Sequence, residues 1–292
     1  MLLKDYISNI DKKYQNLSFS GISFDSYKVK KNNVFFAIKG NNYDGNDFIN
    51  QAIKNGSKII FSQKKISPKK NVTFLRCSNV RKLLAEVSYK IFNKRPEKLI
   101  AVTGTNGKSS VADFYFQILN FNKKKVVSIG TIGVRHKSKK KNISNTTLDS
   151  IQLGKILFNL KKKKIKYVVM EASSHGLEQN RLDGLLFDIG IFTNLSHDHL
   201  DYHKNMENYL NSKLYLFEKL VKEKGNIISD ANIPQIKKLK KISSKKKINL
   251  SLIFSEKKGI QLISHKFENE KQILEIKFKN KKYKIELNLL GK

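Results

Sequence analysis

The sequence predicts an α/β protein of two domains, the second built on a mostly parallel sheet flanked by helices. Its 292 residues suffice for two hydrophobic cores. From about residue 98 onward, short apolar runs alternate with segments whose apolar residues recur at helical spacing. A glycine-containing turn joins one such run to the next helical segment. We place the domain boundary between residues 95 and 96, giving domains 1–95 and 96–292, because Pro96 disfavours continuation of a helix.

The first domain reads as a small α/β unit. Residues 34–38 are apolar and predict a strand, and Asn55-Gly56 predicts the end of a helix that starts near residue 48. The remaining predicted elements of this domain are strands over 58–61 and 72–75 and a helix over 80–92. The order of these elements favours a sheet with helices packed against it.

The second domain alternates strands and helices, which is typical of a parallel sheet. We predict strands over 99–102, 126–129, 167–170 and 187–192, and helices over 109–119, 150–160 and 205–220. Near the end of the chain, alternating apolar and polar residues over 273–278 and 283–289 predict a hairpin.

Composition narrows the class of protein. The net charge of +34 comes almost entirely from lysine, with only five arginines, and the lysine clusters are scattered along the chain. Base recognition prefers arginine and needs the charges on one face, so we expect solvated lysines and no nucleic-acid partner. A basic nucleic-acid-binding protein remains the alternative from another class. The positive field is expected to attract anionic substrates such as nucleotides.

Targeting signals are not evident. No apolar run reaches the roughly 18 residues needed to span a bilayer, and Asp5 interrupts the amino terminus before a secretory signal develops. Cys77 is the single cysteine, which excludes an internal disulfide framework and fits a reducing compartment. We therefore expect a cytoplasmic protein without a membrane partner, in which Cys77 is a small core residue.

The stretch AVTGTNGKSS, residues 101–110, carries the strongest chemical signal. A strand, a glycine-containing turn and a helix in this order form an anion site, because backbone N–H groups and the helix N-terminus face the same negative charge. Lys108 can reach the outer phosphates, and the Ser109 hydroxyl is placed to bind Mg²⁺. The strict phosphate-loop pattern requires glycine where Val102 stands, so an ordinary strand-to-helix turn is the competing interpretation.

Two further clusters follow predicted strands. Glu171 comes directly after the apolar strand 167–170, where a carboxylate can share a metal with Ser109 or simply end the strand at the surface. Residues 194–203 contain three of the six histidines together with two aspartates. That density is typical of a metal site. A zinc-binding module using His197, His199 and His203 is one alternative, and solvated loop histidines are another.

Taken together, these motifs resemble the Mur ligases. The sequences TGTNGKS (103–109), NTT (145–147), EASSHGL (171–177) with Arg181, NLSHDHLDYH (194–203) and ENYLNSK (207–213) occur in the order found in that family. Residues 24–45 are similar to its first domain. The motifs most resemble the branch that adds the third amino acid of the peptidoglycan stem. For that residue we expect meso-diaminopimelate, with L-lysine or another Mur ligase activity as the alternative.

The resemblance implies a UDP-binding N-terminal domain followed by a P-loop-type ATPase domain that is incomplete at its C-terminal end. It also implies that the C-terminal domain that binds the incoming amino acid is absent from this sequence. It also implies ATP and Mg²⁺ as cofactors, small-molecule substrates (a UDP-N-acetylmuramoyl-dipeptide, ATP and an amino acid) and a monomer. The ATP phosphates are expected at Gly104, Thr105, Asn106, Gly107, Lys108, Ser109 and Ser110. Reaction chemistry is expected at Lys108, Glu171, His199 and Lys213.

Metal and substrate positions follow from the same resemblance. Ser109 and Glu171 would hold one Mg²⁺, and Glu171, His199 and a carbamylated Lys213 would hold a second. The UDP end of the substrate is expected at Phe24, Ser26, Asn41, Asn42 and Tyr43. The sugar–peptide part is expected at Asn145, Thr146, Thr147, Ser173, Gln179 and Arg181.

The sequence departs from the family pattern at several positions. Tyr27 replaces an arginine of the first-domain motif, and Lys28 is a partial substitute; Leu148 replaces a proline, and Ser109 a threonine that would carry the same hydroxyl. The family continues beyond the motif LLGK, which ends at Lys292 here. We therefore expect residues 1–292 alone to bind nucleotide but to support little or no ligation.

Overall fold

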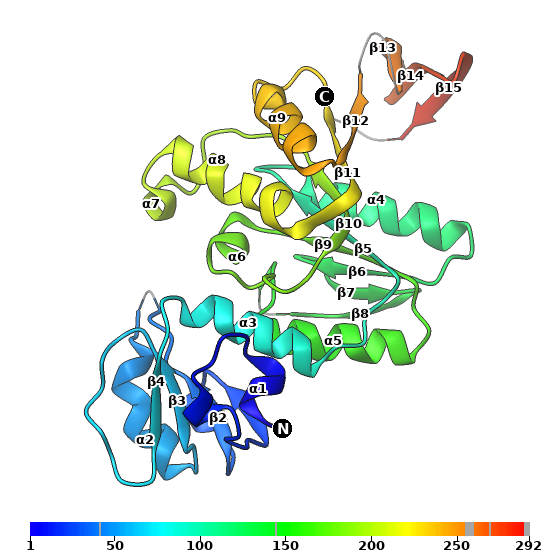
Figure 1. The fold of residues 1–292 in the computed structure, drawn as a ribbon. Coiled ribbons are helices and arrows are strands. Elements are labelled where there is room, and N and C mark those ends of the chain that lie inside the picture. The colour runs from blue at the N-terminus through cyan, green and yellow to red at the C-terminus, as the bar shows by residue number, and fades with distance from the viewer. Residues whose placement is uncertain (41, 144, 255–259, 269, 289–292) are drawn as a thin grey trace. The chain divides into compact units, whose positions relative to one another are not determined.

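The computed structural model describes residues 1–40, 42–143, 145–254, 260–268 and 270–288 (Figure 1). The chain forms two compact units. The first contains residues 1–96, 148–164 and 178–185, and the second contains residues 97–147, 165–177 and 186–292. Two segments that lie beyond residue 96 in the sequence thus pack with the first unit.

The first unit is built on a four-stranded parallel sheet in the order β1-β2-β3-β4. Its strands are β1 (Gly21–Ser23), β2 (Asn33–Phe36), β3 (Ile59–Ser62) and β4 (Thr73–Arg76). Its α-helices are α1 (Leu3–Tyr6), α2 (Ile49–Lys54), α3 (Val80–Ile91) and α5 (Ser150–Lys162). Short 3₁₀ turns are η1 (Lys12–Tyr14), η2 (Ser26–Lys28) and η3 (Gly45–Phe48). The predicted strands and helices of this region are confirmed to within one or two residues.

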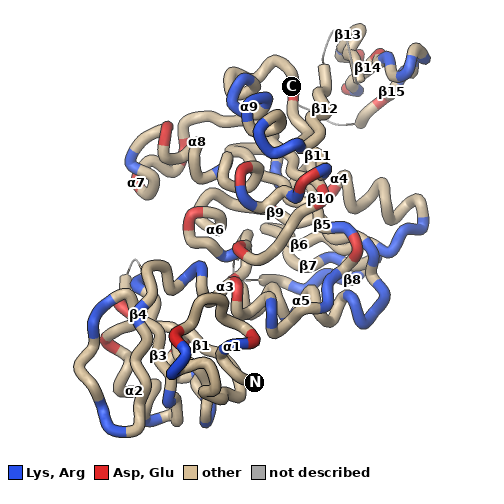
Figure 2. Tube along the Cα trace, viewed as in Figure 1, with Lys and Arg blue, Asp and Glu red and all other residues tan. Residues whose placement is uncertain are grey.

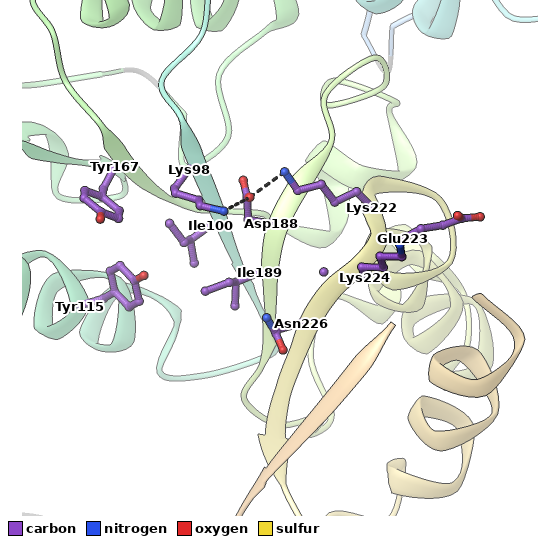
Figure 3. Close-up of a pocket in the computed structure, with 11 residues that line it drawn as sticks. Lys98, Ile100, Tyr115, Tyr167, Asp188, Ile189, Lys222, Glu223, Lys224 and Asn226 are labelled. Atoms are coloured by element: carbon purple, nitrogen blue, oxygen red, sulfur yellow. Dashed lines mark hydrogen bonds and ion pairs between the residues drawn. The ribbon is translucent and has the colours of Figure 1, made fainter. Parts of the chain in front are cut away.

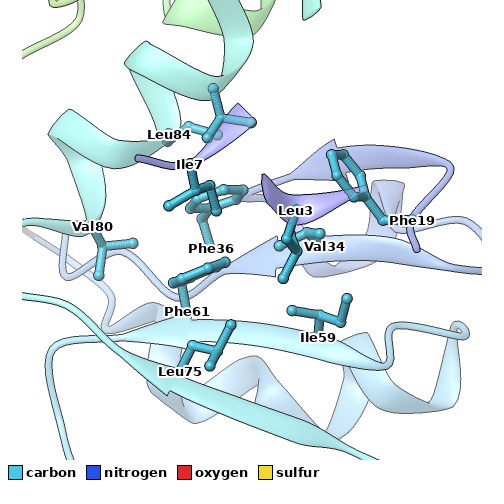
Figure 4. Close-up of a cluster of buried hydrophobic side chains, with 11 residues drawn as sticks. Leu3, Ile7, Phe19, Val34, Phe36, Ile59, Phe61, Leu75, Val80 and Leu84 are labelled. Carbon is cyan, nitrogen blue, oxygen red and sulfur yellow. The ribbon is translucent and has the colours of Figure 1, made fainter. Parts of the chain in front are cut away.

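The alternation of side chains along β2 divides the first unit's core into two layers. Phe36 belongs to a cluster with Phe61 on β3 and with apolar residues of α1 and α3 (Figure 4). Phe35 belongs to the opposite layer with Ile60 and the helix α2. The rings of Phe36 and Phe61 stack with centroids 5.3 Å apart. Cys77 packs against the first cluster, and burial raises the pKa of its thiol to about 11.

The second unit contains an eight-stranded sheet in the order β12-β11-β10-β5-β9-β6-β7-β8. Its strands are β5 (Lys98–Thr103), β6 (Val126–Gly130), β7 (Gly133–His136), β8 (Lys139–Lys141), β9 (Tyr167–Glu171), β10 (Phe187–Phe192), β11 (Val221–Asp230) and β12 (Asn249–Ile253). The pairs from β12 to β6 are parallel, and only β6-β7-β8 are antiparallel. The predicted, mostly parallel sheet is therefore confirmed.

Helices cover both faces of the central strands, as a parallel sheet requires. The helical elements of this unit are α4 (Lys108–Phe121), α6 (Ser174–Glu178), α7 (Leu200–His203), α8 (Met206–Tyr215), the π-helical turn η4 (Leu216–Leu220) and α9 (Ile236–Lys246). Phe116 of α4 packs against Ile100 and Val102 of β5 on one face. On the other face, Phe217 of η4 contacts β10, because Gly190 leaves room for its ring. The carboxyl ends of β5, β6, β9 and β10 consequently meet at one edge.

The chain ends in a separate antiparallel sheet of β13 (Gln261–Glu268), β14 (Lys271–Phe278) and β15 (Lys281–Leu287). The predicted hairpin corresponds to β14 and β15; Leu289, its predicted last residue, lies outside the described residues. The helix predicted over 205–220 ends as an α-helix at Tyr215 and continues as η4.

Lysine and arginine residues are spread over many elements of both units, with a concentration along α9 (Figure 2). None of the helices in the described part of the chain has both the length and the apolar character needed to cross a membrane.

Candidate functional site

The loop between β5 and α4 is hydrogen-bonded to the segment that follows β10. The Thr105 backbone N–H donates to the Asn194 carbonyl at 3.0 Å, and the Asn106 N–H donates to Asn194 Oδ1 at 2.9 Å. Gly107 caps α4 with φ of +79°, a conformation that glycine adopts without a steric cost. Two loop amides already have protein acceptors, so the N–H groups that could still donate to an anion are mainly those of the first turn of α4, which lack helical acceptors.

Lys108, the first residue of α4, folds back over this loop. Its Nζ donates to the carbonyls of Gly104 at 3.0 Å and Thr105 at 2.7 Å. Burial lowers the pKa of Lys108, while the Glu171 carboxylate opposes that shift. The ammonium group therefore already lies at the loop that it is predicted to serve, held by backbone oxygens that an incoming anion can replace.

Glu171 ends β9 and is almost fully buried, with 3% of its surface exposed. Its Oε2 accepts a hydrogen bond from the Ser109 hydroxyl at 2.9 Å. The Thr131 backbone N–H donates to Oε1 at 2.7 Å, and the Thr131 hydroxyl donates to Oε2 at 3.2 Å. Gly130 permits this arrangement, since a Cβ at that position would collide with the carboxylate. The predicted pair of Ser109 and Glu171 is thus in direct contact.

The segment 145–147 also lies beside Glu171, through its backbone carbonyl and through Thr131. Thr147 Oγ1 donates to the Glu171 carbonyl at 3.0 Å and accepts from the Ser173 backbone N–H at 2.9 Å. Thr146 Oγ1 lies 3.0 Å from Thr131 Oγ1. Thr146, Thr147 and Ser173 were predicted from the resemblance, whereas Thr131 was not predicted. Its position one residue beyond β6, whose neighbour in the sheet is β9, is the signal that could have indicated it.

Lys213 on α8 is fully buried, with 1% of its surface exposed. Its Nζ donates to the Gly104 carbonyl at 2.8 Å and lies 4.2 Å from the centroid of the Tyr209 ring. Burial, with a smaller contribution from nearby Lys108, lowers the pKa of Lys213 to about 7. The Tyr209 hydroxyl lies 3.2 Å from Thr105 Oγ1. Tyr209 was not predicted, and it connects α8 with the loop.

The histidine-rich segment packs around the same tyrosine. The ring centroid of His199 lies 6.2 Å from that of Tyr209 and 5.0 Å from that of His175. His203 is buried, 5.0 Å from Tyr209, and burial with the Lys213 charge lowers its pKa. The described residues contain no group of three or more His, Cys, Asp or Glu side chains arranged to hold a metal. The zinc-module alternative using His197 therefore gains no support from the geometry.

The residues expected at the UDP end lie in the first unit. Phe24 and Tyr43 are exposed, at 38% and 74%, and Asn42 is exposed as well. Ser26 is buried, and its carbonyl accepts from the Asn55 side chain at 2.9 Å. Asn41 lies outside the described residues. Lys28, the partial substitute for the missing arginine, pairs with Asp25 at 2.9 Å.

Gln179 and Arg181 are brought together in the first unit. Arg181 donates to Gln179 Oε1 from Nε at 3.1 Å and from Nη2 at 2.7 Å. Arg81 on α3 adds a longer contact to the same oxygen, at 3.4 Å, and donates to the Lys39 carbonyl at 2.8 Å. Arg81 was not predicted; it falls within a helix whose sequence pattern indicated only a core-facing role.

A cavity of about 380 Å³ lies in the second unit near the amino ends of the strands, away from the loop (Figure 3). Asp188 sits in it between Lys98 at 2.9 Å and Lys222 at 2.6 Å, and accepts from the Leu99 backbone N–H at 3.1 Å. Burial raises the pKa of Asp188, but its hydrogen bonds to Lys222 and Lys98 outweigh that effect and hold the pKa below its usual value. The two ion pairs of Asp188 tie β10 to β5 and β11.

Comparison with known families decides the class of protein. A model described as the Mur ligase middle domain matches residues 102–292, well over half of the chain, and one described as the Mur ligase family catalytic domain matches residues 18–94. The chain belongs to the Mur ligase family.

Similar curated Mur ligases share one name. A UDP-N-acetylmuramoyl-L-alanyl-D-glutamate--2,6-diaminopimelate ligase of Rickettsia prowazekii is 41% identical over 80% of this chain and 49% of its own length. The ligase of the same name from Fusobacterium nucleatum is 40% identical over 78% of this chain and 46% of its own length. The chain thus spans about half the length of the curated relatives it matches.

Two solved structures of ligases resemble the structure of this chain. A structure of a UDP-N-acetylmuramoyl-L-alanyl-D-glutamate--2,6-diaminopimelate ligase matches with a TM-score of 0.83 and 25% identity, over 99% of this chain and 60% of the other. The MurF ligase of Thermotoga maritima in complex with ADP matches with a TM-score of 0.59 and 18% identity, over 91% and 57% of the two chains. The second likeness is one of fold alone.

Proposed function

We propose that this chain binds ATP and serves an ATP-dependent ligase reaction that joins meso-diaminopimelate to UDP-N-acetylmuramoyl-L-alanyl-D-glutamate. The observation that carries the proposal is the contact between Ser109, in the first turn of α4, and Glu171, which ends β9, beside Lys108. Relatives at about 40% identity bear the name of this reaction. Because ATP is consumed, we place the reaction in the cytoplasm.

The nucleotide phosphates would lie at the first turn of α4. Lys108 would exchange its two carbonyl contacts for phosphate oxygens, and the amides of residues 108–110 would donate to the same anion. This arrangement concentrates positive charge where negative charge grows during phosphoryl transfer, so the contribution of the protein is chiefly electrostatic.

The donor set suits magnesium. The hydroxyl of Ser109 and the carboxylate of Glu171 are oxygen ligands, which Mg²⁺ prefers, and they lie 2.9 Å apart. The Ser109 proton is directed at Glu171, which leaves the lone pairs of the hydroxyl available to a cation. A bound Mg²⁺ supplies positive charge to the transferring phosphoryl group. In the absence of a cation, Ser109 and Thr131 satisfy the Glu171 carboxylate.

The amide bond would form in two steps. The terminal D-glutamate carboxylate of the acceptor attacks the γ-phosphorus of ATP, which gives an acyl phosphate and releases ADP. The amino group of the incoming amino acid then attacks the acyl carbon, phosphate leaves and a proton is lost from nitrogen. Thr146, Thr147 and Ser173 would contact the sugar–peptide part beside Glu171. We also propose Gln179 and Arg181 as contacts of the sugar–peptide part, and the exposed Phe24 and Tyr43 as contacts of the uridine end.

Lys213 is a candidate for carbamylation. Reaction with CO₂ requires the neutral amine, and a pKa of about 7 makes that form abundant near neutral pH. The carbamate would turn a buried cation into a carboxylate-like metal ligand next to Tyr209, whose ring His199 also contacts. This supports the implied second metal site of Glu171, His199 and Lys213.

Isothermal titration calorimetry with ADP and MgCl₂ tests the proposal. We expect saturable 1:1 binding by the wild-type chain and a loss of at least about tenfold in affinity in Lys108→Ala. Lys240→Ala, an exposed lysine on α9, is the matched control and is expected to bind like the wild type. Binding that is unchanged in Lys108→Ala would refute the assignment of the loop.

A further inference from the structure

Thr131 connects the two halves of the candidate site. Its backbone N–H and hydroxyl both reach the Glu171 carboxylate, at 2.7 Å and 3.2 Å, and the hydroxyl also lies 3.0 Å from that of Thr146. Ser109, on the nucleotide side, donates to the same Glu171 oxygen at 2.9 Å. A continuous chain of hydrogen bonds therefore runs from the first turn of α4 through Glu171 and Thr131 to the segment 145–147.

The donor and the acceptor of each hydrogen bond in this series follow from the number of protons that each group carries. A carboxylate only accepts, so the single hydroxyl proton of Thr131 is committed to Glu171 Oε2. The contact between the two threonine hydroxyls then needs its proton from Thr146. With that proton directed at Thr131, Thr146 presents only lone pairs to anything that approaches it from solution.

We propose that Thr131 is a positioning residue that fixes the Thr146 hydroxyl as a hydrogen-bond acceptor, so that Thr146 selects an N–H donor, such as an amide of the acceptor's peptide, rather than a carbonyl oxygen. The inference rests on the proposed function for the identity of the acceptor. It deepens that function, because it assigns to Thr131 the coupling between the carboxylate at the nucleotide site and the recognition of the second substrate.

The fold keeps this link in place. Gly130 ends β6 opposite Glu171 on β9, and the absent side chain lets the carboxylate lie over the strand end. Thr131 then begins the two-residue turn between the paired residues Gly130 and Gly133 of β6 and β7. Thr147 anchors the other end of the link through the Glu171 carbonyl at 3.0 Å. Both threonines are therefore held by the backbone of the sheet edge.

Calorimetry on Thr131→Val and Thr131→Ser tests the proposal. The probes are UDP-N-acetylmuramoyl-L-alanyl-D-glutamate and, separately, ADP without metal. Valine keeps the shape and the N–H bond to Oε1 but removes the hydroxyl, so acceptor affinity should fall about tenfold while ADP affinity changes less than about threefold. Serine should restore acceptor binding, a rescue that a merely structural role does not predict. Thr73→Val on β4 of the first unit is the matched control.

Urea unfolding of Thr131→Val, Thr146→Val and the double variant tests the link without any ligand. We expect the second substitution to lower the free energy of unfolding clearly less in the background of the first than in the wild type. The reason is that the hydrogen bond between the two threonine hydroxyls is already lost. Additive losses, or an acceptor affinity unaffected by Thr131→Val, would overturn the inference. If the wild type binds neither probe while the unfolding losses are non-additive, the proposed function fails and the hydrogen-bonded link stands.

Discussion

Lys213 offers a sharp test of the electrostatics at the site. It is fully buried and its pKa is lowered to about 7, against an ordinary value near 10.5. Between these two values the unfolded chain binds a proton at this residue that the folded chain does not, so stability must rise with pH. One pKa unit corresponds to about 1.4 kcal/mol, and from about pH 7 to about pH 9 this lysine alone should add about 2 kcal/mol to the free energy of unfolding.

Replacing Lys213 by methionine removes the titrating group and keeps the apolar stem. Urea unfolding in CO₂-depleted buffer, at about pH 7 and about pH 9, should show the wild type gaining about 2 kcal/mol more than Lys213→Met over this interval. Lys240→Met, at an exposed site on α9, should keep the wild-type dependence. An identical pH dependence in wild type and Lys213→Met would refute the reasoning that burial depresses this pKa.

Three further substitutions probe the same account. Gly130→Ala should displace the Glu171 carboxylate and weaken Mg²⁺-dependent ADP binding about tenfold, measured by calorimetry, with metal-free ADP binding nearly unchanged; equal losses with and without metal would contradict it. Glu171→Gln should abolish the gain in ADP affinity that Mg²⁺ produces, and a surviving metal dependence would exclude Glu171 as a ligand. Asp188→Asn should lower the free energy of unfolding by about 1 to 2 kcal/mol near pH 7. Because the Asp188 pKa is depressed, the wild-type advantage should disappear as the pH falls below about 4, and a constant advantage would show that the ion pairs are not its source.

The parts of the second unit that were predicted correctly have strong local patterns. The apolar run of β5, the glycine turn and the helical spacing of α4 predict the loop from local sequence, although Asn194 also holds it in the fold. Glu171 could be placed at the sheet edge because the carboxyl ends of parallel strands meet there. The strand β11 was missed because Val221–Asp230 begins with charged residues directly after a helix, and the strand becomes recognisable only when β10 and β12 pair with it.

The residues that sequence reasoning missed act through tertiary contacts. Thr131 is an exposed turn residue that no local sequence feature distinguishes. Only the register of β6 against β9 brings it to Glu171. Lys213 was predicted from the resemblance, but its burial cannot be recognised among so many lysines, because it depends on the contact of α8 with Gly104. Asp188 interrupts an apolar strand, and its partners Lys98 and Lys222 come from two other strands.

A crystal structure of the chain with Mg²⁺ and a non-hydrolysable ATP analogue tests the central claim most directly. The account predicts the terminal phosphates at the first turn of α4, with Lys108 Nζ turned from Gly104 and Thr105 onto the phosphate oxygens and the cation touching both Ser109 Oγ and Glu171. A nucleotide bound elsewhere, or bound here with Lys108 still on the loop carbonyls and no cation between Ser109 and Glu171, would contradict it.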